Sequence, residues 1–91
     1  MKVIVRAKAK DDIDDLFAWI AKDNSTVAIK MVVNVHAHIN RLETDGLAHM
    51  GHAGTVAGTL ELVVYPYIIV YKVYERREIV IISVVHGARN R

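Results

Sequence analysis

Cysteine is absent from this chain of 91 residues. Its absence excludes disulfide bonds, thiolate catalysis and zinc sites built on cysteine, and it fits a reducing compartment. A large charge of one sign is also missing, because 12 lysines and arginines face 10 aspartates and glutamates. A net charge of +2 is too small to predict nucleic-acid binding by bulk electrostatics, so any basic site must be local.

A long hydrophobic run is missing as well. The most apolar stretch, residues 60–73, is interrupted by Glu61, Pro66 and Lys72, which excludes a membrane span. The first apolar residues run into charge too early for a secretory signal peptide. We therefore expect a soluble cytoplasmic protein without membrane contact, folded as one domain over residues 1–91, a length that suffices for one core.

The first third of the chain has strand and helix patterns. Residues 2–6 have the composition of a short strand, and residues 9–22 are predicted to form a helix. Its apolar stripe consists of Ile13, Leu16, Phe17 and Ile20. Four aspartates, at positions 11, 12, 14 and 15, crowd its first turns. We interpret them as a solvated helix start and not as a metal site, since no histidine is near in sequence.

A second helix is predicted over residues 26–43, with Ser25 as its cap. Its main apolar face consists of Ala28, Met31, Val35, Ile39 and Leu42. Ile29 and Val33 form a second apolar patch about a third of a turn away. The short connection predicts an antiparallel helical hairpin, whose spare patch must lie against the sheet or a partner.

The second half of the chain has strand patterns. Residues 44–58 hold four of the five glycines and are predicted to be a loop, and strands are predicted at residues 58–64, 67–75 and 79–85. The last of these is almost wholly β-branched, which favours a central position in a sheet. The order strand, helix, helix, three strands predicts an α+β fold, an antiparallel meander sheet packed against the N-terminal helical hairpin.

Four segments together resemble a known family. They are the loop from Met50 through Gly51 and Gly54, the Gly58-Thr59-Leu60-Glu61-Leu62 strand, the Pro66-Tyr67-Ile68-Ile69-Val70-Tyr71 strand and the ending His86-Gly87-Ala88-Arg89. This combination is similar to the RelE/ParE toxin superfamily, most of all to its ParE, or plasmid-stabilisation, branch. The likeness extends over nearly the whole chain.

The resemblance implies the toxin of a type II toxin–antitoxin pair, encoded with an antitoxin that neutralises it by direct binding. ParE-like toxins inhibit DNA gyrase by protein contact, which is the function we expect here. RelE-like toxins are endoribonucleases that cut messenger RNA on the ribosome, and they form the main alternative. A degenerate toxin that binds only its antitoxin is a third reading. None of the three implies a cofactor or sequence-specific DNA binding by the toxin alone.

The chain departs from the family at the glycine loop. Relatives commonly carry arginines at the positions of His52, Thr55 and Leu60, and a proline at the position of Ala57. If those arginines contact the target, this chain has altered target binding.

His86 and Arg89 are the candidate catalytic residues if the protein is a ribonuclease. An imidazole can carry protons near neutral pH, and a guanidinium can hold a phosphate with two hydrogen bonds. The alternative for His86 is a structural hydrogen bond at a strand end. Arg76 and Arg77 are expected at the opposite end of the last strand, away from His86.

Two other groups of residues have simpler explanations. Tyr65, Tyr67, Tyr71 and Tyr74 could stack on RNA, but half-buried strand tyrosines are the preferred interpretation. His36 and His38 point about 200° apart on a helix and cannot share an ion. His49 and His52 lack further ligands nearby, so no metal site is predicted.

Two surfaces are predicted to bind proteins. Trp19 lies off the main stripe of the first helix and, with Ile29 and Val33, is the candidate contact for the antitoxin. An amphipathic helix or strand would suit this surface. His52, Arg89 and Arg91 are the candidate contacts for the target.

Overall fold

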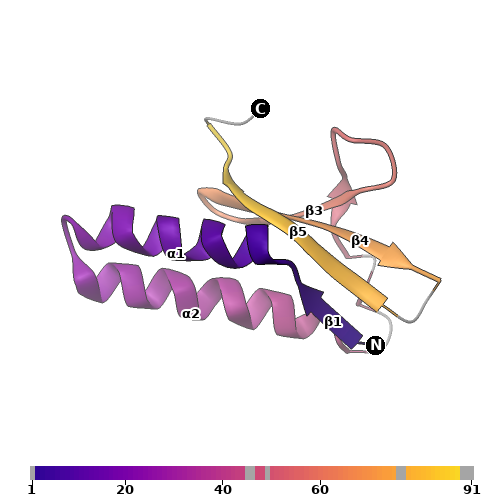
Figure 1. Ribbon diagram of the computed structural model, residues 1–91, viewed down its shortest axis with the longest axis horizontal. Coiled ribbons are helices and arrows are strands. Elements are labelled where there is room, and N and C mark those ends of the chain that lie inside the picture. The colour runs from indigo at the N-terminus through magenta and orange to yellow at the C-terminus, as the bar shows by residue number, and fades with distance from the viewer. Residues whose placement is uncertain (1, 45–46, 49, 76–77, 89–91) are drawn as a thin grey trace.

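The computed structural model describes residues 2–44, 47–48, 50–75 and 78–88. The elements, in chain order, are β1 (Lys2–Val5), α1 (Ala7–Ala21), α2 (Ser25–Arg41), β2 (His52–Ala53), β3 (Leu60–Val64), β4 (Tyr67–Tyr74) and β5 (Glu78–His86). The two helices lie side by side on one face of the sheet (Figure 1). The predicted α+β architecture and order of elements are therefore confirmed.

The sheet has the strand order β1-β5-β4-β3-β2, which confirms the central place of the last strand. The meander of β3, β4 and β5 is antiparallel, as predicted. The sheet as a whole is mixed, because β1 pairs with β5 in parallel. Parallel neighbours need a long connection, which here consists of the hairpin and the strands β2, β3 and β4, and this pairing was missed. The two-residue strand β2 was missed too, since it is too short to show a pattern.

Both helices bury most of the stripe that their sequence predicts, but Phe17 of α1 is 37% exposed. The ends of both helices also differ from the prediction. Helix α1 begins at Ala7, two residues early, so its first turn contains no acidic residue and the aspartates lie further along. Helix α2 is capped by Asn24 and not by Ser25. The Asn24 side chain accepts a hydrogen bond from the Val27 N–H at 3.0 Å, which satisfies one of the unpaired donors of the first turn.

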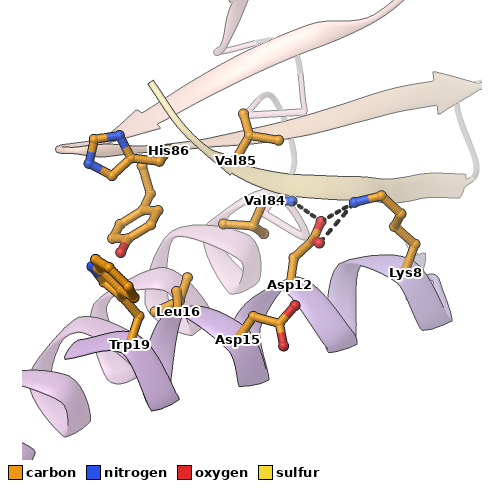
Figure 2. A pocket seen from close by; sticks show the side chains of 9 residues that line it. Lys8, Asp12, Asp15, Leu16, Trp19, Val84, Val85 and His86 are labelled. Atoms are coloured by element: carbon orange, nitrogen blue, oxygen red, sulfur yellow. Dashed lines mark hydrogen bonds and ion pairs between the residues drawn. The ribbon is translucent and has the colours of Figure 1, made fainter. Parts of the chain in front are cut away.

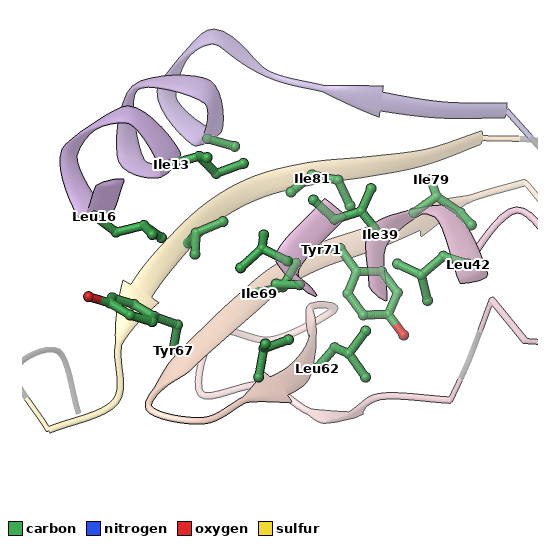
Figure 3. Packing of buried hydrophobic residues seen from close by; sticks show 14 of the residues in the cluster. Ile13, Leu16, Ile39, Leu42, Leu62, Tyr67, Ile69, Tyr71, Ile79 and Ile81 are labelled. Atoms are coloured by element: carbon green, nitrogen blue, oxygen red, sulfur yellow. The ribbon is translucent and has the colours of Figure 1, made fainter. Parts of the chain in front are cut away.

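The core lies between the sheet and the hairpin (Figure 3). Its largest fully buried side chains come from α2 and its C-cap residue Leu42, from β4 and from β5: Tyr71, Ile39, Leu42, Ile69, Ile79, Ile81 and Val35. Ile79, Val80 and Ile81 are buried on both faces of the sheet, whereas Ile82, Ser83, Val85 and His86 are only half-buried. The two-sided burial expected of the last strand therefore holds for its first half.

A β-bulge separates the two halves of β5. Val70 pairs with Ser83, whereas its neighbour Tyr71 pairs with Ile81, so Ile82 is an extra residue on β5. Such a bulge interrupts the regular alternation of side chains along a strand.

The bulge decides which way the end of β5 faces. Strict alternation from Ile81 would send Val84 and His86 to the face away from the helices. Instead, Val84 packs in the same core cluster as Ile81. His86, two residues further on, is therefore on the helix side of the sheet as well.

Neither helix, over the residues that the structure describes, is long and apolar enough to cross a membrane.

Candidate functional site

A pocket lies between α1 and the C-terminal end of β5 (Figure 2). It encloses about 540 Å³ and is lined by Lys8, Asp12, Asp15, Leu16, Trp19, Tyr67, Val84, Val85 and His86. Helix α1 supplies its acidic and apolar wall, and the half of β5 beyond the bulge supplies the opposite wall. We call it the β5 pocket.

Trp19 and His86 meet in this pocket, although the sequence analysis assigned them to different functions. Trp19 is 57% exposed, and the Lys22 ammonium lies 5.1 Å from the centre of its ring. Ile29 and Val33, which were grouped with Trp19, do not line the β5 pocket. They lie on α2 with exposures of 55% and 62%, so their patch faces solvent and not the sheet.

The imidazole of His86 is held by its neighbours. Its Nδ1 accepts a hydrogen bond from the Ala88 N–H at 3.2 Å, and its ring packs edge-on against Tyr67 with ring centres 5.4 Å apart. An accepting Nδ1 has no proton, so the neutral ring carries its proton on Nε2. In this arrangement the Nδ1 lone pair is engaged by the backbone, and Nε2 is a donor.

Asp12 closes the edge of β5. Its Oδ2 accepts a hydrogen bond from the Val84 N–H at 3.0 Å, and its two oxygens each receive the Lys8 ammonium at 2.8 Å. The Asp12 side chain is 17% exposed, so it is not part of a solvated helix start. The sequence could not single out Asp12 among four aspartates, because its role depends on where α1 crosses β5.

The glycine loop, residues 50–59, contains the edge strand β2 and forms a second candidate site. Gly51 donates its N–H to the Tyr71 hydroxyl at 3.0 Å. A Cβ at Gly51 would lie 2.7 Å from the Glu61 carbonyl oxygen and 2.8 Å from that hydroxyl, so the loop can approach the sheet only with glycine here. Burial raises the pKa of the Tyr71 phenol, while the bond from Gly51 lowers it by less.

Glu61 holds the same loop from beneath. It is 7% exposed, and its Oε2 accepts a hydrogen bond from the Thr55 N–H at 3.3 Å. With these anchors in place, His52 and Val56 are presented to solvent, the latter at 65% exposure. Sequence analysis missed Glu61 and Tyr71 as loop supports, because their partners lie 6 and 20 residues away.

The described histidines are not gathered around a common point. No group of three or more histidine, aspartate or glutamate side chains lies close enough to hold an ion anywhere in the described residues. Instead, Nδ1 of His38 lies 2.8 Å from the Asn34 carbonyl on the same helix. The predictions for His49, Arg76, Arg77, Arg89 and Arg91 fall outside the described residues.

Comparison with known proteins identifies the family. The family described as "ParE toxin of type II toxin-antitoxin system, parDE" matches residues 3–91. A solved structure described as "Chromosomal ParDE TA system from P. aeruginosa" has the same fold, with a TM-score of 0.80 and 20% sequence identity. The alignment covers 94% of this chain and 95% of that one. No curated protein matches the chain in sequence. The family match extends over both candidate sites, and the chain belongs to the ParE toxins of type II toxin–antitoxin systems.

Proposed function

We propose that this ParE toxin inhibits DNA gyrase in the cytoplasm by protein contact, without catalysis of its own, and that a cognate antitoxin neutralises it. Membership of the ParE family supports the first part, since the resemblance implies gyrase as the target of this branch. The description of the similar structure as part of a ParDE TA system supports the second.

The observation that carries the non-catalytic reading is the hydrogen bond from Ala88 to Nδ1 of His86. A ribonuclease needs a base to take the proton of the ribose 2′-hydroxyl, and in this geometry the Nδ1 lone pair of His86 is engaged by the Ala88 N–H. The two carboxylates of the β5 pocket, Asp12 and Asp15, outnumber its one ammonium, Lys8. Their charge opposes the approach of an RNA phosphate.

The glycine loop is the surface that we assign to the target. Its backbone is fixed on the sheet by Tyr71 and Glu61, so His52 and Val56 are held out toward solvent on a supported loop. Preorganised loops lose little conformational entropy when they bind. Arg89 and Arg91 are assigned to the same function from the sequence alone. Trp19, Ile29 and Val33 are assigned to the antitoxin, because all three expose large apolar surface.

The test compares the wild-type chain with the variant His86→Ala in three assays. In cells, expression of the toxin alone should stop growth, and co-expression of the small protein encoded with it should restore growth. In vitro, the purified toxin should block supercoiling by gyrase, and His86→Ala should retain this inhibition because no proton transfer is lost.

A translation extract provides the opposing measurement. If the protein were a ribonuclease, it would cut message in the extract and leave supercoiling intact. The His86→Ala change would then lower cleavage by about 10²–10⁴-fold, the usual contribution of a general acid or base. A chain that is harmless in all three assays would be a degenerate toxin.

A further inference from the structure

A second pocket lies on the face of the sheet that turns away from the helices. Its floor consists of Ile68 and Val70 from β4 and of Ile82, Ser83 and Val85 from β5. Ile68 and Val70 flank a residue of the core, and alternate residues of a strand lie on opposite faces, so both point away from the helices. The pocket encloses about 260 Å³, and we call it the sheet pocket.

The β-bulge widens the floor of the sheet pocket. Ile82 and Ser83 are consecutive residues, yet both line the pocket, whereas a regular strand would send one of them to the core. The extra residue, Ile82, therefore adds an aliphatic side chain to this face of the sheet. Among the residues of β4 and β5 that line the pocket, only Ser83 is polar.

The glycine loop forms the wall of the sheet pocket through Thr55, Val56 and Thr59. Hydrogen bonds fix this wall. Gly54 donates its N–H to the Thr59 carbonyl at 2.8 Å, and the Thr59 hydroxyl donates to the Val56 carbonyl at 2.6 Å. Glu61 accepts the Thr55 N–H from beneath. The shape of the pocket therefore exists before any partner binds, which lowers the entropy cost of binding.

The size and charge of the sheet pocket limit its occupant. Pockets for small-molecule ligands usually enclose about 300–1,000 Å³, so this pocket suits one side chain better than a whole substrate or cofactor. Among the described residues that line it, none is a lysine, arginine or histidine, and the one charged residue is Glu61. No cation there can hold a nucleic-acid phosphate. The aliphatic floor instead favours an apolar side chain, because burying it removes apolar surface from water.

We propose that the sheet pocket receives one large apolar side chain of the target protein, of the leucine, methionine or phenylalanine type. This inference rests on the proposed function, because it places a residue of gyrase on this toxin. Val56 joins the two surfaces, since it lines the pocket and is also 65% exposed on the loop that we assign to the target. A protein seated on that loop therefore also covers the pocket. Side chains that fill such pockets contribute most of the binding energy of an interface.

Filling the pocket tests the proposal. Ser83→Leu adds a branched side chain to the floor. The matched control is Val63→Leu, which enlarges a 48% exposed residue on the same face of β3 that does not line the pocket. The assay measures the concentration of purified toxin that halves supercoiling by gyrase. We expect this concentration to rise at least about tenfold for Ser83→Leu, because the side chain of the target is excluded, and less than about twofold for Val63→Leu.

Val85→Thr is a second variant, which keeps the shape of the floor. It replaces a methyl group by a hydroxyl, so the pocket loses apolar surface and inhibition should weaken about three- to tenfold. The affinity of each variant for the small protein encoded with the toxin is measured in parallel. It should stay within about twofold of the wild type, because the surface that we assign to the antitoxin lies on the helices. Circular dichroism melts show whether each variant is folded, and sedimentation gives the oligomeric state of the free toxin.

The outcomes separate this inference from the proposed function. If the wild type inhibits gyrase and either folded variant, Ser83→Leu or Val85→Thr, inhibits it equally well, the inference is overturned and the proposed function stands. If Ser83→Leu loses affinity for the encoded protein and not for gyrase, or dissociates a dimer of the free toxin, the antitoxin or a second copy occupies the pocket and the inference is also overturned. If the wild type does not inhibit supercoiling, the proposed function fails and the inference falls with it.

Discussion

The hydrogen bond between Tyr71 and Gly51 should be a measurable part of the stability of this toxin. The Tyr71 side chain is fully buried, and its hydroxyl accepts the Gly51 N–H at 3.0 Å. The substitution Tyr71→Phe keeps the ring in the core but removes that acceptor. Losing such a bond, with the donor left unsatisfied, costs about 1–2 kcal/mol in free energy of unfolding. For a chain of this size, we expect the melting temperature to fall by roughly 4–15 °C.

The matched control is Tyr67→Phe. Tyr67 is also buried, on the same face of β4, but its hydroxyl has no hydrogen-bond partner among the described residues. Its loss should change the free energy of unfolding by less than about 0.5 kcal/mol. Both variants are compared with the wild type by urea titration and by thermal melts at neutral pH. Equal stability of the two variants would show that the Gly51 bond contributes nothing.

The pH dependence of the free energy of unfolding provides a second, independent test of the role of Tyr71. Burial raises the pKa of Tyr71 from its usual 10.0, so the folded state prefers the neutral phenol. This preference stabilises the fold fully below about pH 10 and is lost as the pH rises through the raised pKa. Tyr71→Phe lacks the titrating group, so the wild type should lose more stability than the variant above about pH 10. If the wild type instead became increasingly more stable than Tyr71→Phe as the pH rises, the raised pKa of Tyr71 would be refuted.

Two further substitutions test local features. Gly51→Ala places a Cβ 2.7 Å from the Glu61 carbonyl oxygen, so we expect a loss of about 1–3 kcal/mol in urea titration, and a variant as stable as wild type would contradict the close approach. Asn24→Ala removes the acceptor for the Val27 N–H, so the free energy of unfolding should fall by about 0.5–2 kcal/mol. Ser25→Ala is its control and should lower the free energy of unfolding by less than about 0.5 kcal/mol. A larger loss for Ser25→Ala than for Asn24→Ala would show that Ser25 is the cap.

Most of the architecture follows from periodicity in the sequence. Apolar spacing predicted both helices, and the β-branched run of residues 79–85 predicted the central strand, because these patterns are set by which faces must be buried. The ends of the helices were predicted less well. Asn24 and Ser25 are both good capping residues, and only the backbone conformation of the folded chain decides between them.

The parallel pairing of β1 could not be predicted from local pattern. Lys2–Val5 and Glu78–His86 are separated by the entire hairpin and the meander, so their register depends on contacts between distant residues. Asp12 is a consequence of that pairing. Because β1 stops at Val5 and α1 starts at Ala7, the helix crosses the unpaired half of β5 and brings one of four similar aspartates to the Val84 N–H.

The bulge at Ile82 connects the core of this toxin to its candidate binding surface. A regular strand would have placed Val84 and His86 on the face opposite the helices, where the pair could not meet Trp19 on α1. The extra residue returns both side chains to the helix side, so that Val84 fills the core and His86 borders the β5 pocket. In the sequence, Ile82 is one β-branched residue within an apolar run, and nothing local marks it as unpaired. The composition of this segment therefore predicts that a buried strand forms. The pairing of β5 with β4 determines on which face of the sheet the side chains of its C-terminal half lie.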